Sequence, residues 1–183
     1  NIYWNGYYYY DGEVRNAHIS DYADSRTSSF MPVQQSTEML WSLSEWEKLD
    51  GKYALANNGE LITDFIYDEC GSCGNDELIA VCKDGKWGYI NSTGKEVIPL
   101  QFDATWNRYS SDEINVENLD AEDGTEEFCY ASSQGYIPLR QGDQWELCDT
   151  KGNIIIPFGE FDEILPVNMS KKCWVKKDGK WGV

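Results

Sequence analysis

The chain is poor in positive charge and in histidine, and it contains no long apolar segment. Its 183 residues include 15 Lys and Arg against 32 Asp and Glu, for a formal net charge of −17, and one histidine, His18. A surface that binds nucleic acid or anionic lipid needs clustered Lys and Arg. No apolar run approaches the roughly 20 residues of a membrane-spanning helix. We therefore expect no nucleic-acid partner and no direct insertion of this segment into a membrane.

The scarcity of histidine also limits the catalytic chemistry that the chain can offer. A Ser-His-Asp arrangement could use only His18, which lies in a segment without a clear pattern. A pair of carboxylates could hydrolyse glycosides, but no spacing singles out two among the 32 acidic residues. We predict no catalytic residues and no enzymatic activity, with a carboxylate-dependent hydrolase as the weaker alternative.

Six cysteines are present, and two of them have a spacing that suggests metal or redox chemistry. Cys70 and Cys73 are separated by two residues, but a zinc site needs a second ligand pair, and no βαβ pattern surrounds the motif. A local disulfide would suit an extracellular protein, whereas free thiols would suit an anaerobic habitat. Residues 118–124 match a calcium loop poorly, because Leu119 falls at the first ligand position. We expect no metal ion and no cofactor.

What the chain does have is a recurring peptide. The sequence Asp-Gly-Lys-Trp-Gly at residues 84–88 returns at residues 178–182, with diverged copies at residues 50–54 and 142–146. Each full copy continues through a glycine turn and an apolar run to an aromatic-Asp pair, and these pairs are Tyr67-Asp68, Phe102-Asp103 and Phe161-Asp162. An apolar stretch also precedes each copy, at residues 30–33, 78–81, 136–139 and 173–175. The recurrence indicates one supersecondary unit used several times.

These motifs resemble the WG-repeat family, also called KWG repeats, over residues 49–183. Tyr53-Ala54 and Trp145-Glu146 depart from the Trp-Gly pattern, so the glycine is not needed in every copy. The resemblance implies a bacterial protein, often exported or joined to other domains, and it brings no catalytic residues. On this basis we expect the extracellular space or cell surface of a bacterium. Because the chain begins at Asn1 and not at Met, we expect a signal segment ahead of it.

The spacing of the repeat predicts strands. Apolar runs of four to six residues are cut by glycine turns, and Asn58-Gly59 is a strong signal for a type I′ hairpin turn. Each unit then forms about three antiparallel strands in a meander, with one face buried and the other partly wet. The predicted fold is all-β, with units stacked or curled into a barrel-like or solenoid array and one short N-terminal helix. The predicted units are residues 49–83, 84–141 with an insertion at 104–135, 142–177, and a partial unit at 178–183.

Residues 1–48 do not form an obvious copy, and we predict that they cap the array. Residues 2–9 are expected to form a hairpin around Asn5-Gly6. Residues 36–47 are expected to form the helix, with Ser36 as its N-cap.

The aromatic residues, 14% of the chain, supply the candidates for both core and ligand contact. The repeated rings are predicted core anchors, since each buries a large apolar area: Tyr53, Trp87, Trp145 and Trp181. Candidates for ligand contact lie off the core face or in the insertion, although each could instead cover the second face of a sheet: Trp4, Tyr7, Trp106, Tyr109 and Trp174. The repeated aspartates are predicted to cap turns.

These observations favour a non-catalytic binding module whose partner is a protein or a carbohydrate such as a glycan or cell-wall polymer. The alternative is a structural spacer that holds another domain at a distance.

Overall fold

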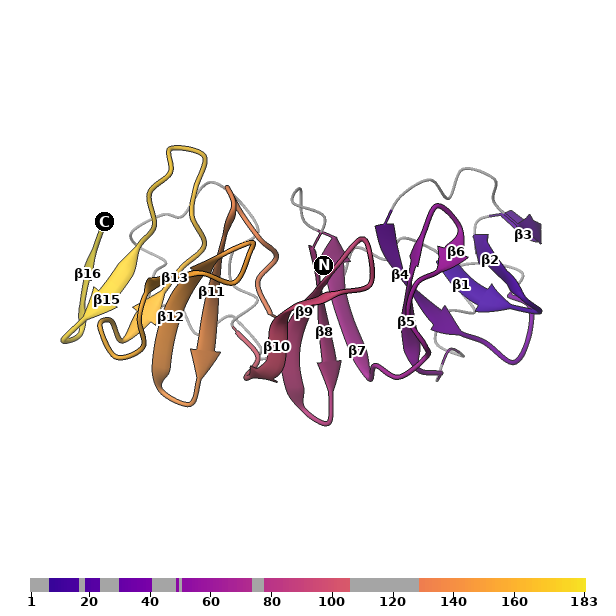
Figure 1. The fold of residues 1–183 in the computed structure, drawn as a ribbon, viewed down its shortest axis with the longest axis horizontal. Helices are drawn as coiled ribbons and strands as arrows, with labels where there is room; N and C mark the ends of the chain where they lie inside the picture. The colour runs from indigo at the N-terminus through magenta and orange to yellow at the C-terminus, as the bar shows by residue number, and fades with distance from the viewer. Residues whose placement is uncertain are drawn as a thin grey trace.

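The structure, a computed structural model, describes residues 7–16, 19–23, 30–40, 49, 51–73, 78–105 and 129–183. These residues form strands arranged in four sheets. Figure 1 shows the sheets standing side by side in an open row, with β1–β3 at one end and β15 and β16 at the other. The prediction of an all-β array of stacked units is confirmed.

The first sheet is mixed and has the strand order β3-β2-β1-β4-β5-β6. Its strands are β1 (Tyr7–Tyr10), β2 (Glu13–Asn16), β3 (Ile19–Ala23), β4 (Phe30–Gln35), β5 (Tyr53–Asn57) and β6 (Glu60–Leu61). β1 and β4 run parallel, with Tyr8 opposite Gln34, a pairing that lies ahead of the units predicted to be antiparallel meanders. The other pairs in this sheet are antiparallel.

The other three sheets are antiparallel meanders. The second sheet has the order β10-β9-β8-β7, and its strands are β7 (Glu69–Cys73), β8 (Leu78–Lys83), β9 (Lys86–Asn91) and β10 (Glu96–Phe102). The third sheet contains β11 (Tyr136–Gln141), β12 (Gln144–Asp149) and β13 (Ile154–Ile156). The fourth contains β14 (Glu163–Ile164), β15 (Val175–Lys177) and β16 (Lys180–Gly182).

Several of the hairpin turns between these strands have the positive φ angles that a type I′ turn requires. Asn58 and Gly59 have φ of 53° and 80°, and Asp84 and Gly85 have φ of 52° and 76°. The same geometry occurs in the N-terminal segment, where Asp11-Gly12 joins β1 to β2 with φ of 52° and 82°. β1 therefore pairs with β2 on one edge and β4 on the other. The predicted hairpin around Asn5-Gly6 is not the hairpin of β1, and residues 1–6 lie outside the described residues.

The helix predicted over residues 36–47 is wrong for the part that the structure describes, which contains no helix at residues 36–40. The amide of Ser36 donates to the carbonyl of Tyr9 at 2.9 Å, and the amide of Leu40 donates to the Tyr8 hydroxyl at 3.1 Å. Leu40 is also buried against Tyr8. These tertiary contacts with β1 outweigh the local helix signal, and residues 41–47 lie outside the described residues. Among the residues that the structure covers, no helix is long and apolar enough to cross a membrane.

Each inner sheet is buried on both faces because it stands between two others. In β8, Leu78, Ala80 and Cys82 pack towards the third sheet, whereas Ile79 and Val81 pack towards the first. The expectation of one partly wet face is therefore wrong for this strand. We call the face that points to the next sheet along the chain the forward face, and the opposite one the rear face.

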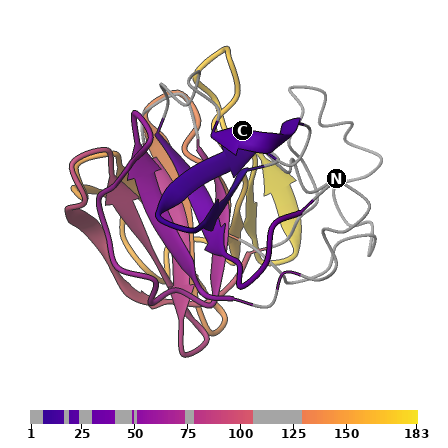
Figure 2. The same cartoon turned by 90° about the vertical axis from the view of Figure 1, so that its right-hand side faces the viewer.

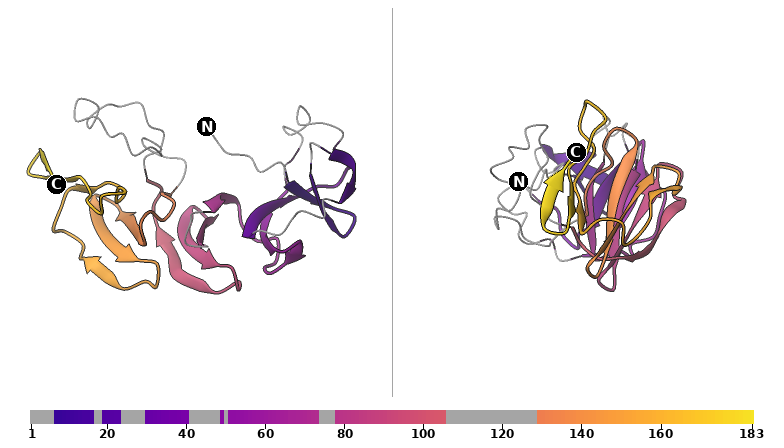
Figure 3. Two further views of the ribbon diagram at one scale, coloured as in Figure 1. Left: turned by 90° about the horizontal axis from the view of Figure 1, so that it is seen from above. Right: turned by 90° about the vertical axis from the view of Figure 1, so that its left-hand side faces the viewer.

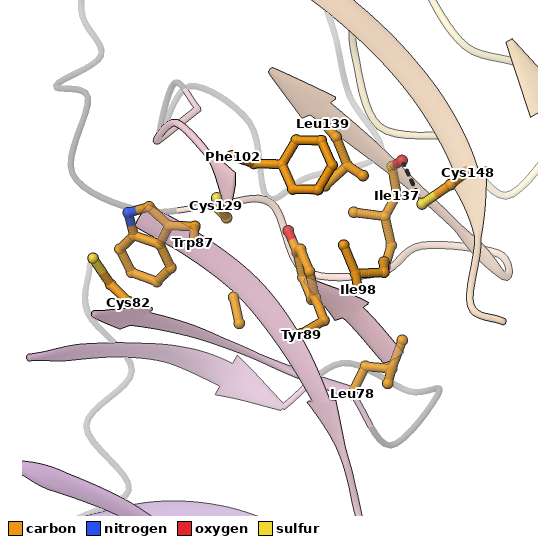
Figure 4. Packing of buried hydrophobic residues seen from close by; sticks show 11 residues of the cluster. Leu78, Cys82, Trp87, Tyr89, Ile98, Phe102, Cys129, Ile137, Leu139 and Cys148 are labelled. Atoms are coloured by element: carbon orange, nitrogen blue, oxygen red, sulfur yellow. Dashed lines mark hydrogen bonds between the residues drawn. The ribbon is translucent and has the colours of Figure 1, made fainter. Parts of the chain in front are cut away.

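The core between the second and third sheets shows how two faces meet (Figure 4). Trp87 and Tyr89 on the forward face of β9 lie in one cluster with Ile137 and Leu139 on the rear face of β11. The Tyr89 hydroxyl donates to the carbonyl of Tyr130 at 2.6 Å, so the polar end of this buried ring is satisfied.

At the N-terminal end, the first sheet curls and covers its own rear face. Met31 and Val33 of β4 lie in one cluster with Val14 of β2, against which Tyr7 and Tyr9 of β1 also pack. Figure 2 shows β1–β3 turning across this end of the row. The rear face of the first sheet is thus closed by strands of the same sheet.

Candidate interaction surface

The repeated aromatic residues lie on the forward faces of successive sheets. Trp87 and Trp145 are each 3% exposed, and Tyr53 is half-buried. Each packs in a cluster with two apolar side chains from the rear face of the next sheet: Ile79 and Val81 for Tyr53, Ile137 and Leu139 for Trp87, Cys173 and Val175 for Trp145. The two members of each rear pair stand two residues apart, and in β8 and β11 this spacing places both side chains on one face of the strand.

Three aspartates connect each sheet to the following one, and we call them the linking aspartates: Asp68, Asp103 and Asp162. Their backbone amides donate at 2.8 Å to the carbonyls of Cys82, Arg140 and Lys176 in the next sheet.

The carboxylates of the linking aspartates accept from the next hairpin turn. Asp68 accepts from the Asp84 amide at 2.8 Å, Asp103 from the Gly142 amide at 2.7 Å, and Asp162 from the Gly179 amide at 3.5 Å. The predicted capping therefore acts on the hairpin turn of the following unit, from a position where the chain passes from one sheet to the next.

Lysines of the repeat complete two of these links. Lys86 donates to Asp103 at 2.6 Å, and Lys52 pairs with Asp68. The Gly142 amide and then the Lys86 ammonium hold the pKa of Asp103 below its usual range. Lys52 and then the Asp84 amide lower the pKa of Asp68 in the same way. These carboxylates remain ionised and hydrogen-bonded to lysines and backbone amides, which supports a structural role for the repeated aspartates.

The buried cysteines are poor nucleophiles. Burial raises the pKa of both Cys129 and Cys148 to about 12, so neither thiol is ionised near neutral pH. Cys82, Cys129 and Cys148 lie in the core between the second and third sheets. Across the described ranges, no group of three or more His, Cys, Asp and Glu side chains is placed to hold a metal ion.

The forward face of the fourth sheet differs from the other three, because no further sheet covers it within the described residues. Lys176 stands opposite Trp181 in the β15–β16 pair, and its Nζ lies 5.4 Å from the centroid of the Trp181 ring. Trp174 directly precedes β15 and Val183 directly follows β16, and continuing the alternation of these strands by one residue puts both on the same face. Trp174 and Trp181 are half-buried, and Val183 is 65% exposed. We call these four residues the end face, and Figure 3 (right) looks onto this end of the row.

The end face also belongs to a C-terminal segment that is not acidic. Residues 151–183 contain six Lys and four Asp or Glu, a net charge of +2. The preceding 150 residues contain nine Lys and Arg against 28 Asp and Glu, a net charge of −19. An acidic surface is therefore favoured as the neighbour of the end face over a basic one.

The residues predicted to contact a ligand do not lie on one surface. Trp174 belongs to the end face, and it is joined there by Trp181, which had been expected to be a core anchor. Tyr7 is half-buried and packs in the N-terminal core next to Met31 and Val33, at the other end of the row. The remaining candidates, Trp4, Trp106 and Tyr109, lie outside the described residues. Strand alternation in residues 173–183 was the signal that could have grouped Trp174, Lys176 and Trp181.

The fold and the repeated contacts define an all-β repeat protein whose units stack through an aromatic forward face and an apolar rear pair. The family model for the WG containing repeat matches residues 57–87, 87–107 and 147–181. The chain belongs to the WG-repeat family. No curated protein and no solved structure matched the chain.

Proposed function

We propose that the chain is a non-catalytic interaction module that binds a partner protein through its end face. The observation that carries this proposal is the contrast among the four sheets. A following sheet covers three aromatic forward faces, where Trp87 and Trp145 are buried and Tyr53 is half-buried, whereas the fourth presents Trp174, Trp181 and Val183 with no sheet over it in the described residues. Uncovered apolar side chains grouped on one face are typical of interaction sites.

The chemistry of the end face suits a protein better than a glycan. Tryptophan is enriched among the residues that contribute most to protein–protein binding. The equivalent faces elsewhere in this chain bind flat, apolar sheet surfaces. Lys176 beside the Trp181 ring adds a positive charge that would meet an acidic rim on the partner.

A spacer is the second candidate, and the linking aspartates favour it. They join neighbouring sheets by backbone and side-chain hydrogen bonds, so that the row is tied together at every step in the described residues. A spacer would leave the end face without a binding partner of its own. Export to the cell surface stays a prediction from the family resemblance.

Photocrosslinking at the end face tests the proposal. A benzophenone amino acid placed at Val183 is expected to capture protein partners from extracts of the source cells. The matched control carries the same group at Ile155, which is 50% exposed on β13 and lies outside the end face. Equal adducts from both positions would contradict the proposal, and no adducts from either would favour the spacer. Sedimentation with insoluble polysaccharides that is lost in Trp181→Ala would show a carbohydrate ligand instead.

A further inference from the structure

Glu146 of β12 is a buried carboxylate. Of the charged residues in the described ranges, it alone is buried, with 5% of its surface exposed. It makes no hydrogen bond and no ion pair within the part of the chain that the structure describes. Burying a charge without a partner costs free energy, because the protein does not replace the hydrogen bonds that water supplies. The ionised form of Glu146 is therefore disfavoured in the folded protein.

Glu146 lies on the rear face of β12, which points to the second sheet. It stands opposite Leu139, and Cys148 follows it two residues later on the same face. Leu139 and Cys148 belong to the apolar core between the second and third sheets, where Figure 4 shows them, and Phe158 packs against that core. The carboxylate thus stands beside an apolar interface between two sheets.

The second sheet has a glycine where the third has this glutamate. A Cβ at Gly88 would stand 2.5 Å from the carbonyl oxygen of Ile98, so β10 leaves no room for a side chain there. β13 ends at Ile156, opposite Leu147, and places no residue opposite Glu146. The third sheet therefore has room for a titratable group at an interior position of the repeat.

The other titratable groups in this core are neutral near pH 7. They are Cys82 of β8, Tyr89 of β9, Cys129 and Cys148. Burial raises the pKa of Cys129 and Cys148 to about 12, and it raises the pKa values of Cys82 and Tyr89 as well. The residues that β10 contributes to the core, Ile98 and Phe102, are apolar, and β13 consists of isoleucine alone. Burial likewise raises the pKa of Glu146.

The cations at the border of this interface are bonded to other groups. The Arg140 guanidinium of β11 donates to the carbonyls of Ala104 at 2.8 Å and Gly142 at 3.3 Å. The Lys86 ammonium of β9 donates to Asp103 at 2.6 Å. Neither cation forms an ion pair with Glu146.

Asp103 and Glu146 stabilise this interface over different ranges of pH. The lowered pKa of Asp103 means that its contribution is lost only as the pH falls below the ordinary aspartate value of about 4. The raised pKa of Glu146 has the opposite effect. Protonation of Glu146 stabilises the fold fully below the ordinary glutamate value of about 4.3, and this contribution is lost as the pH rises through the raised folded value.

We propose that Glu146 makes the interface between the second and third sheets sensitive to pH, and that this interface is most stable at weakly acidic pH. Uptake of a proton by Glu146 removes a buried charge while the link between Lys86 and Asp103 is still intact. At neutral pH the ionised carboxylate favours opening of the interface, because opening lets water reach it. This property lies within the row of sheets and does not depend on a partner at the end face.

Backbone hydrogen exchange tests the proposal by comparing the protein with Glu146→Gln, which keeps the size of the side chain and removes its charge. Comparison at one pH cancels the intrinsic pH dependence of exchange. At neutral pH, amides of β9 and β11 should exchange several-fold faster in the unsubstituted protein than in the variant. The ratio should fall towards one near pH 4.5, roughly the ordinary glutamate pKa. Amides of β4 and β5 should show the smallest ratio, because the first sheet lies outside this interface.

Glu160→Gln is the matched control, since Glu160 is an exposed glutamate shortly after β13. Its ratio should stay at one at every pH. The carboxyl ¹³C signal of Glu146, assigned by its loss in Glu146→Gln, should titrate with a midpoint above that of an ordinary glutamate. A midpoint at or below the ordinary value would overturn the proposal even if the variant failed to fold. An exchange ratio that does not change with pH, or one that is equal in all four sheets, would overturn it as well.

Discussion

At the scale of single residues, the same side chain meets different surroundings in successive units. Trp87 and Trp145 are 3% exposed between two sheets, whereas Trp181 is half-buried on the last. The free energy that each ring contributes to folding should differ accordingly, since it scales with the apolar area removed from water.

We predict that Trp87→Ala and Trp145→Ala each lower the free energy of unfolding by about 3–5 kcal/mol, because each leaves a large cavity. Trp181→Ala should lower it by less than about 1 kcal/mol, as expected for a partly exposed site. Urea unfolding followed by circular dichroism measures all three. Equal losses at Trp145 and Trp181 would show that the last ring is covered as well as the others.

The linking aspartates should make the free energy of unfolding depend on pH. The pKa of Asp103 is lowered in the folded protein by the Gly142 amide and by Lys86. A depressed folded pKa means that this carboxylate stabilises the fold fully above the ordinary aspartate pKa of about 4. The contribution is lost as the pH falls from there towards the lower folded pKa.

We therefore predict that Asp103→Asn lowers the free energy of unfolding by about 1 kcal/mol at neutral pH, as for a partly exposed charge-assisted hydrogen bond. The difference from the unsubstituted protein should shrink as the pH falls below about 4. The control is Asp143→Asn, at an exposed aspartate of the adjoining turn. A difference that stays constant from neutral to acid pH would show that the ionised form is not what matters at Asp103.

At the scale of elements, the glycine of the repeat has a steric role in the second sheet. A Cβ at Gly88 would stand 2.5 Å from the carbonyl oxygen of Ile98 and 2.8 Å from the amide nitrogen of Leu100. Both are backbone atoms of β10, which continues past Gly88 to pair Phe102 with Trp87. In the third sheet, β13 ends at Ile156, which stands opposite Leu147 of β12. No residue of β13 therefore stands opposite Glu146, the preceding residue of β12. This explains why one copy tolerates glutamate where another has glycine.

We predict that Gly88→Ala destabilises the protein by about 1–3 kcal/mol, because β10 must move to admit the methyl group. Gly182→Ala is the matched control, since a Cβ there meets nothing within 4 Å. Its effect should stay within about 0.5 kcal/mol. Thermal or urea unfolding of the pair measures the contrast, and equal effects would remove the steric explanation.

Much of this element structure could be predicted from the sequence. Short apolar runs and Asn-Gly or Asp-Gly pairs indicated the strands and their hairpins correctly, because both signals are local. Asp11-Gly12 carried the same turn signal and was missed, since no tryptophan follows it. The prediction of a helix over residues 36–40 was wrong because it used a local pattern alone. The contacts that Ser36 and Leu40 make with β1 join residues that are far apart in the sequence.

At the scale of the whole molecule, the sequence could not show which faces are covered. The alternation in β8 fitted a half-wet sheet, yet Ile79 and Ala80 are both buried because a sheet stands on each side. Coverage depends on how units are placed in space, which no single unit encodes. The same applies to the candidate site, because Trp174 and Trp181 belong to one face only once β15 and β16 are paired.

The two ends of the row differ in a way that carries the functional proposal. The first sheet curls over its own rear face, and the last presents an aromatic forward face with no following sheet in the described residues. Figures 1 and 3 show these ends at opposite sides of an open row. The proposed partner meets the molecule at the end that carries Trp181.

The most direct test of this account is the ¹⁹F solvent isotope shift of each tryptophan in the full chain labelled with 5-fluorotryptophan, with signals assigned by single Trp→Phe variants. We expect small shifts for Trp87 and Trp145 and clearly larger shifts for Trp174 and Trp181. A Trp181 signal as protected as that of Trp87, or a Trp87 signal as exposed as that of Trp181, would contradict stacking through aromatic forward faces with an open end.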